Sequence, residues 1–408
     1  MGTRDSSQEL LLKQVTLMSS YLFQQLLNGI QLGTIYALIA LGYTMVYGII
    51  KLINFAHADI FMVGAYVAFF LVAYLSGTSG SMPVQLCIWP SVVFGYLALG
   101  FAAERIPFVK SFFGSFELRR KNAPAVWTRA AISFAKSVVQ MLLIMLLAGV
   151  SAPVLYLFTR TFFKPPLNLF SIPAIIVYVM AICALLGMAM EKIAYRPLRH
   201  KPRISALITA MGVSFFLENF CSLDIVFGNK YQAFPTLIQK HDVIRFAGSG
   251  VAINNIFIIN MTVLACMLFL LWFIVEKTLI GKQMRAVAFD HKTASLMGID
   301  VERTISITFM IGPALAGVSG ILYAMNYGIL QSPFLGFYPG LKAFIAAVLG
   351  GIGSLPGAVL GAFLMGITEV FANSIDSNLG FAAAFVVLIV ILLIKPTGIL
   401  GKKEIDKV

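Results

Sequence analysis

The stretch from 253 to 275, INNIFIINMTVLACMLFLLWFIV, contains 23 residues and no charged side chain. At about 1.5 Å per residue, a helix of this length crosses the roughly 30 Å hydrocarbon core of a bilayer. Apolar side chains occur on every face of this helix, whereas the strands of a transmembrane barrel alternate polar and apolar residues over about 10 positions. The stretch therefore predicts an all-α membrane protein.

The composition of the whole chain indicates many such spans. Of its 408 residues, 59% are hydrophobic and 12% are charged, whereas soluble domains carry about 25% charged residues. So few charges cannot cover a water-facing surface, and we expect a polytopic transmembrane bundle with about 10 spans. The four cysteines stand singly in apolar segments, which excludes a disulfide-linked scaffold.

The net charge of +13 is concentrated between the apolar runs. Segments 104–136, 191–203, 276–303 and 395–408 hold 21 of the 30 basic residues. Loops on the cytoplasmic side of a membrane collect Lys and Arg, so we assign these four segments to that side. This enrichment of Lys and Arg accounts for the net positive charge, so no nucleic-acid partner is expected. The expected environment of the chain is the lipid bilayer.

A broken apolar stretch from 341 to 371 contains GGIGSLPG at 350–357. Residues 341–349 are too few to cross a bilayer, so we expect a half-helix followed by an unwound segment. Interrupted helices mark the translocation paths of transporters. Path candidates here are Gly350, Gly351, Gly353 and Pro356, although an ordinary cytoplasmic turn between two helices is the alternative.

A second irregularity, KLINFAHAD at 51–59, separates the apolar runs 21–50 and 60–75. Asn54, His57 and Asp59 are its path candidates, because ionisable groups at membrane depth usually face a cavity or a partner. The alternative places these side chains in water at the cytoplasmic interface.

Two short sequences suggest that the chain contains an inverted repeat. YTMVYGI at 43–49 and YAMNYGI at 323–329 are identical at five of seven positions. The expected topology makes the first run inward and the second outward, as in many transporters. A chance match between two helices is the alternative.

The sequence contains no constellation for catalysis, metal binding or a cofactor. The four histidines are far apart, and GKQ at 281–283 lacks the Ser or Thr of a nucleotide-binding P-loop. ATP hydrolysis, if used, must come from a partner subunit, and the chain is not expected to be an enzyme.

Between two spans, GKQMRAVAFDHKTASLMGIDVER at 281–303 predicts a short amphipathic helix over 282–297. Such a helix can lie in a groove of a partner protein, although a solvated loop helix without a partner is the alternative. The residues that would make this contact are Arg285, Asp290, Lys292, Met297 and Gly298.

Four blocks of sequence carry a family resemblance. ALIALGYTMVYGIIKLINFAHADIFMVGAY at 37–66, EKIAYRPLRHKPRISALITAMGVSFFLEN at 191–219, RAVAFDHKTASLMGID at 285–300 and the 350–357 region resemble the branched-chain amino acid ABC transporter permeases, of the shorter, high-affinity subunit type. The resemblance implies a cell inner-membrane location, a homologous second permease subunit, cytoplasmic ABC ATPase subunits and an external substrate-binding protein. It also implies that 281–303 couples the permease to the ATPase.

Two features depart from the family pattern. Ala58 and Asp59 stand where the family usually has Gly and Glu, which bears on the substrate, and about 80–100 residues after position 75 have no counterpart in the shorter members. Two rival functions are a stand-alone channel or secondary transporter for small polar solutes such as urea or amides, and a membrane scaffold.

The expected segments are the polar N-terminus (1–20), the first core (21–75), an insert with extra spans at 84–103 and 137–158 (76–171), core spans (172–275), the coupling segment (276–303), C-terminal core spans (304–394) and a cytoplasmic tail (395–408).

Overall fold

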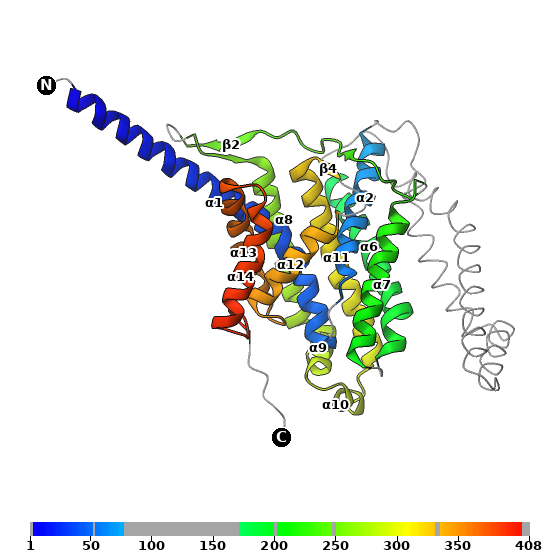
Figure 1. The fold of residues 1–408 in the computed structure, drawn as a ribbon. Coiled ribbons are helices and arrows are strands. Elements are labelled where there is room, and N and C mark those ends of the chain that lie inside the picture. Colours follow the sequence, from blue (N-terminus) through cyan, green and yellow to red (C-terminus); the bar gives the residue numbers. More distant parts are fainter. Residues whose placement is uncertain are drawn as a thin grey trace.

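The computed structural model describes residues 3–51, 54–76, 171–199, 202–224, 226–246, 250–330 and 335–401. These residues form a helical bundle with two short antiparallel pairs of strands (Figure 1). The all-α class predicted from the sequence is therefore confirmed. The two extra spans expected at 84–103 and 137–158 lie outside the described residues.

Seven helical segments of the described chain are long and apolar enough to cross a bilayer. Two further apolar helices, α12 and α14, are shorter. The helices are α1 (Thr3–Ile50), α2 (His57–Leu75), α6 (Ser171–Met190) with its extensions η1 (Glu191–Tyr195) and η2 (Arg196–Leu198), α7 (Arg203–Cys221), α8 (Asn255–Trp272) with η3 (Phe273–Lys277), α9 (Leu279–Phe289), α10 (His291–Leu296), α11 (Val301–Tyr327), α12 (Phe337–Gly350), α13 (Leu355–Ile375) and α14 (Leu379–Ile394).

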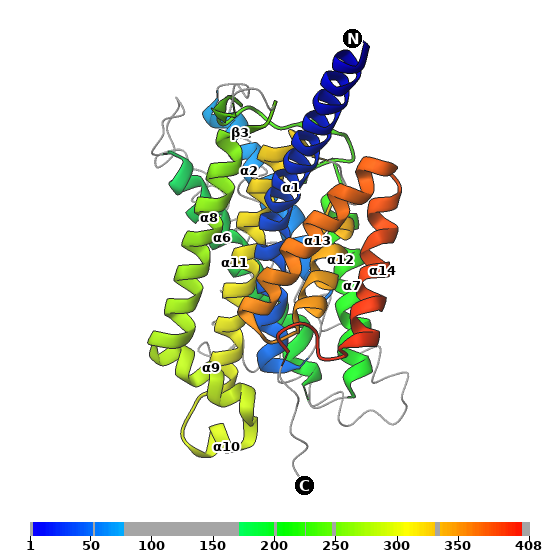
Figure 2. The same ribbon diagram turned by 90° about the vertical axis from the view of Figure 1, so that its left-hand side faces the viewer.

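The two ends of the bundle differ in structure. Strands β1 (Gln232–Ala233) and β4 (Ile329–Leu330) pair at one end, as do β2 (Asp242–Arg245) and β3 (Ala252–Asn254). Helices α9 and α10 project at the opposite end, on the side of the C-terminus (Figures 1 and 2). Because α9 and α10 lie in the basic segment 276–303, we expect their end of the bundle to be the cytoplasmic one, and it is called the inner end below.

Helices α1 and α11 run antiparallel through the centre of the bundle. Gly42 packs against Gly312, Ser319 Oγ donates to the carbonyl of Ile35, and Gln31 Nε2 donates to Asn326 Oδ1. As the residue number rises along α11, it falls along α1. The two runs that carry YTMVYGI and YAMNYGI therefore have opposite directions, as the sequence predicted.

The packing around α1 and α11 repeats with the same offset. Gly366 on α13 packs against Gly29 and Gly33 of α1, and Gly187 on α6 packs against Phe309 and Pro313 of α11. Phe309 and Pro313 lie 280 residues after Gly29 and Gly33, and 323–329 lies 280 residues after 43–49. The chain thus contains the predicted inverted repeat, α1–α2–α6 and α11–α12–α13, with small residues at its close helix crossings.

Both repeats have a helix that begins inside the bundle. After α1 ends, the chain turns back so that His57, the first residue of α2, packs against Gly42 of α1. After α11 ends, the chain returns so that Gly336 and Gly340, at the start of α12, pack against Ala58. The first residues of α2 and α12 are also 280 positions apart. Both breaks therefore lie at the depth where non-helical backbone must be enclosed by protein.

The glycine-rich stretch at 350–357 differs from its expected role. Residues 351–354 form a tight turn between the antiparallel helices α12 and α13, and Gly353 lies beside Gly48, two residues before the end of α1. The turn is therefore at the inner end, as in the alternative of an ordinary turn. The half-helix exists, but its break inside the bundle precedes α12 instead of following it.

Candidate functional site

The INFAH residues lie inside the protein where α2 begins. Asn54, His57 and Asp59 are all at most 2% exposed, which contradicts the alternative of solvated side chains. Tyr195 donates a hydrogen bond of 2.6 Å to Asn54 Oδ1, and Ser214 Oγ lies 2.5 Å from Asp59 Oδ2. The segments 191–203 and 203–221 thus enclose the break before α2.

Several polar atoms of this cluster have no hydrogen-bond partner among the described residues. They are Asn54 Nδ2, both ring nitrogens of His57 and Asp59 Oδ1. A buried polar group without a partner costs about 1–3 kcal/mol. Such groups are uncommon in folded proteins and often have a functional role, so the cluster is the strongest candidate for a polar part of a path.

The start of α12 faces this cluster. Gly336 packs against the backbone of Ala58 and Asp59, and Gly340 packs against Ala58. The N-terminus of α2 and that of the half-helix α12 therefore meet inside the bundle. Helix N-termini carry partial positive charge, and N-termini of broken helices bind anionic groups in transporters.

A small apolar pocket continues from this point toward the inner end, between α1 and α12. Tyr43, Tyr47, Phe344, Ala347 and Ile352 line the pocket. The ring of Tyr43 also lies 4.7 Å from the ring of His57. One lining residue, Tyr43, thus contacts the INFAH cluster, and another, Ile352, belongs to the turn at 351–354.

The glycine-stretch candidates shape that turn. Gly351 and Gly353 have φ angles of 102° and 95°, which residues with a Cβ atom rarely adopt. Gly350 packs against Gly357, and Pro356 occupies the first turn of α13. These residues lie at the far end of the pocket from the INFAH cluster, so the two sets of path candidates are separate groups.

An ion pair inside the bundle was missed by the sequence reasoning. Lys342 Nζ on α12 lies 2.5 Å from Glu369 Oε1 on α13, and Tyr36 of α1 donates to Glu369 Oε2 at 2.8 Å. Glu369 had no obvious partner in the sequence. The pairing could not be read there because Lys342 is 27 residues away on another helix.

The coupling candidates lie in two short helices instead of the single helix expected over 282–297. Helix α9 ends at Phe289 because Asp290 adopts an extended backbone conformation. The carboxylate of Asp290 then caps α10 by accepting from Lys292 N at 2.9 Å and Thr293 Oγ1 at 2.7 Å. Gly298, with a φ of 79°, ends the turn after α10. Asp290 and Gly298 therefore set the shape of the segment.

Arg285 is engaged within the coupling segment as well. Its guanidinium pairs with Glu276 at 3.2 Å and donates to the carbonyl of Val275. Large apolar side chains on this segment are exposed: Phe289 is 78%, Leu296 86% and Met297 78% exposed. Of these three residues, the sequence analysis named only Met297. The sequence signal for the other two is that Phe289 and Leu296 are large apolar residues in the basic segment 276–303.

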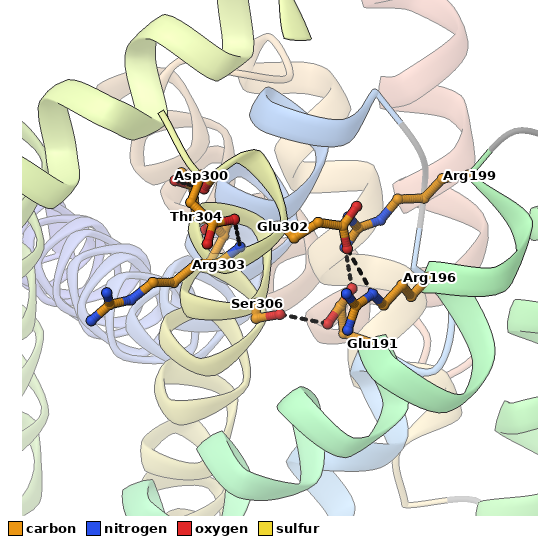
Figure 3. A network of polar contacts seen from close by, with 9 residues as sticks. Glu191, Arg196, Arg199, Asp300, Glu302, Arg303, Thr304 and Ser306 are labelled. Carbon is orange, nitrogen blue, oxygen red and sulfur yellow. Dashed lines mark hydrogen bonds and ion pairs between the residues drawn. The ribbon is translucent and has the colours of Figure 1, made fainter. Parts of the chain in front are cut away.

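The segment after α6 forms a polar network with the start of α11 (Figure 3). Buried Glu191 accepts from Arg199 and from Ser306 Oγ at 2.7 Å. Glu302 pairs with Arg199 Nη1 at 2.6 Å and with Arg196 Nε at 2.7 Å. These arginines belong to AYRPLR at 194–199, and the acidic Glu191 just before them is the sequence signal that was overlooked.

Comparison with known proteins identifies the family. The family model for the permease component of branched-chain amino acid transport systems matches residues 25–395. The chain belongs to this family. It is 33% identical to the high-affinity branched-chain amino acid transport permease LivH of Escherichia coli K12 over 390 residues, which cover 95% of this chain and 98% of LivH. It is 34% identical to BraD of Pseudomonas aeruginosa, with 94% of this chain and 97% of BraD covered. The search of solved structures gave no match.

Membership fixes the general function of this permease. It is a multi-pass membrane protein and a transport component, which agrees with the seven helices that can cross a bilayer. The resemblance inferred from INFAH and AYRPLR is confirmed. Both motifs of this permease family lie where α2, α6 and α7 meet, joined by the hydrogen bond between Tyr195 and Asn54.

Proposed function

We propose that this permease works as one of two homologous subunits of an ABC importer in the cell inner membrane. Cytoplasmic ATPases drive the importer, and an external binding protein delivers leucine, isoleucine, valine or a related amino acid. The names of the relatives support the substrate class, since LivH and BraD are branched-chain amino acid permeases. The sequence has no P-loop of its own, so the ATPase is a separate chain.

The exposed apolar end of the coupling segment is the observation that carries the ATPase contact. Phe289 ends α9, Leu296 ends α10 and Met297 follows it, and all three side chains are exposed. Helices α9 and α10 extend beyond the bundle at the inner end (Figure 2). A group of large exposed apolar side chains on one short segment is typical of a protein interaction site. Lys292 places a positive charge near them in the sequence, which favours a groove with acidic residues on the ATPase.

Packing also supports a link between this contact and the membrane. His291 Nε2 lies 3.1 Å from the carbonyl oxygen of Ile49, in the last turn of α1. Movement of α10 would therefore act on the end of α1, next to the break before α2. We place the amino-acid path along the INFAH cluster and the pocket between α1 and α12, where a second subunit would complete it.

Affinity purification from native membranes tests the proposal. We expect a homologous permease and one or two ABC ATPases to co-purify, and the complex in liposomes to take up radiolabelled leucine only with ATP and the binding protein. Uptake of urea or another small solute by the chain alone, without ATP, would instead establish the channel or secondary transporter.

A further inference from the structure

The AYRPLR segment touches both the coupling segment and the INFAH cluster. It consists of the end of η1, η2 and the residue that follows, Arg199. Neighbouring side chains of this segment reach in opposite directions, toward the break before α2 and toward the start of α11. The segment is therefore a candidate for a mechanical connection between these two regions.

Tyr195 makes the contact with the INFAH cluster. It is buried, and its hydroxyl donates to Asn54 Oδ1 at 2.6 Å. Its ring lies 5.2 Å from the ring of Phe309 on α11. Asn54 lies in the link between α1 and α2 and has no hydrogen bond from its amide nitrogen among the described residues. The Tyr195 hydroxyl is therefore a principal restraint on the Asn54 side chain.

Arg196 and Arg199 make the contact with the coupling segment. Both pair with Glu302, which lies two residues after Asp300 in the first turn of α11. Asp300 caps this helix by accepting from Arg303 N at 3.0 Å. Figure 3 shows Glu302 extending from α11 toward the two arginines, with Glu191 and Ser306 beside them. Any displacement of the end of the coupling segment therefore moves the partner of both guanidinium groups.

Buried Glu191 makes the arrangement stiff. Its two carboxylate oxygens accept from different elements, Arg199 of the AYRPLR segment and Ser306 of α11. Removing one member of a buried charged network is costly because the remaining charge loses its partner. Arg199 is thereby held between the end of α6 and α11.

We propose that the AYRPLR segment transmits the movement of the coupling segment to the break before α2, through Glu302, Arg196 and Arg199 at one end and Tyr195 and Asn54 at the other. This inference rests on the proposed function. Its residues are positioning residues, since none of them is placed against the ATPase or the substrate.

A double-mutant cycle on the reconstituted importer tests the connection. The variants are Tyr195→Phe, Glu302→Gln and the double variant, and the readout is radiolabelled leucine taken up per ATP hydrolysed. Tyr195→Phe removes one hydroxyl and keeps the ring, so the fold is retained. Because a hydrogen bond contributes about 0.5–1.5 kcal/mol, we expect each single variant to lower this ratio about threefold to tenfold.

The double variant shows whether Tyr195 and Glu302 act along one route or independently. If the two residues act along one route, its ratio equals that of the worse single variant, whereas independent effects would multiply. Multiplied effects, or equal losses of uptake and ATP hydrolysis at a constant ratio, overturn the inference. Arg245→Gln, which breaks an exposed pair with Asp242 at the other end of the bundle, is the matched control and should change nothing.

The same experiment separates this inference from the proposed function. Wild-type protein that takes up no leucine with ATP and the binding protein refutes the proposed function, and the inference falls with it. Wild-type protein that is active, with Tyr195→Phe at the wild-type ratio and with normal recovery of the complex, refutes the inference alone.

Discussion

Lys342 and Glu369 form an ion pair between α12 and α13, inside the part of the bundle that crosses the membrane. Tyr36 of α1 completes the hydrogen bonding of the carboxylate, and the Lys342 ammonium lies 6.0 Å from the ring of Phe381 on α14. One ion pair thus links the half-helix α12 to three other helices, α1, α13 and α14. Charged groups in such a place are costly unless they are paired.

Removal of one partner of this pair should destabilise the protein. Lys342→Met leaves Glu369 buried without a counter-charge, which costs about 3–5 kcal/mol. We expect a lower midpoint of thermal unfolding in detergent, and the double variant Lys342→Met with Glu369→Gln should regain much of the loss. Lys240→Met, which removes a surface hydrogen bond to Asn326, serves as the control. A double variant no more stable than Lys342→Met would argue against the ion pair.

The glycine crossings of the inverted repeat should not accept a methyl group. In Gly366→Ala, the new Cβ meets the backbone of Gly29 and Gly33, and overpacking of this kind costs about 1–3 kcal/mol. A Cβ added at Gly212 on α7 would meet no atom within 4 Å, so Gly212→Ala should be neutral or slightly stabilising. Thermal unfolding and folded yield compare the two variants. Equal behaviour of both would be incompatible with the crossing described here.

Polar substitution of the exposed apolar side chains at the inner end should release the ATPase. We expect Leu296→Ser to reduce the amount of co-purifying ATPase about 30-fold, as for a central interface residue of about 2 kcal/mol, with the fold unchanged. Ile375→Ser is the control, because Ile375 is similarly exposed, at 82%, at the other end of α13. Normal ATPase recovery with Leu296→Ser would remove this surface from the proposed contact.

The carboxylate of Asp59 should matter more for transport than its contact with Ser214. Asp59→Asn keeps an oxygen that can accept from Ser214 but replaces the carboxyl group beside the N-termini of α2 and α12 with an amide. Because a buried polar group without a suitable partner costs about 1–3 kcal/mol, leucine uptake should fall about tenfold with normal recovery of the complex. Ser214→Ala should have a small effect. Normal uptake by Asp59→Asn would place Asp59 outside the path.

The sequence predicted the parts of this protein that depend on neighbouring residues. A run such as 253–275 specifies a transmembrane helix because each of its backbone groups bonds within the helix. The seven-residue match at an offset of 280 also suggested the opposed repeats, because α1 and α11 carry similar residues at equivalent positions of the two repeats. The insert at 76–171 and the role of the candidate residues remain predictions.

Local patterns were less informative where one residue changes the backbone. The single amphipathic helix expected over 282–297 is two helices because Asp290 caps the second of them. The break beside 350–357 was placed after α12 instead of before it. Glycines predicted an interruption there, but their sequence does not distinguish a turn at the membrane surface from one inside the bundle.

The fold class and the family followed from the sequence alone, since apolar length, periodicity and motif spacing are local properties of the chain. The seven-residue match only suggested the inverted repeat, and the antiparallel packing of α1 and α11 supports it. Only the tertiary structure decided which polar groups meet. Tyr195 reaches Asn54 across 141 residues, and Lys342 reaches Glu369 from another helix. The physical reason is that such partners are selected by how closely the small residues of α1, α11 and α13 let the helices approach, and that approach is a property of the assembled bundle.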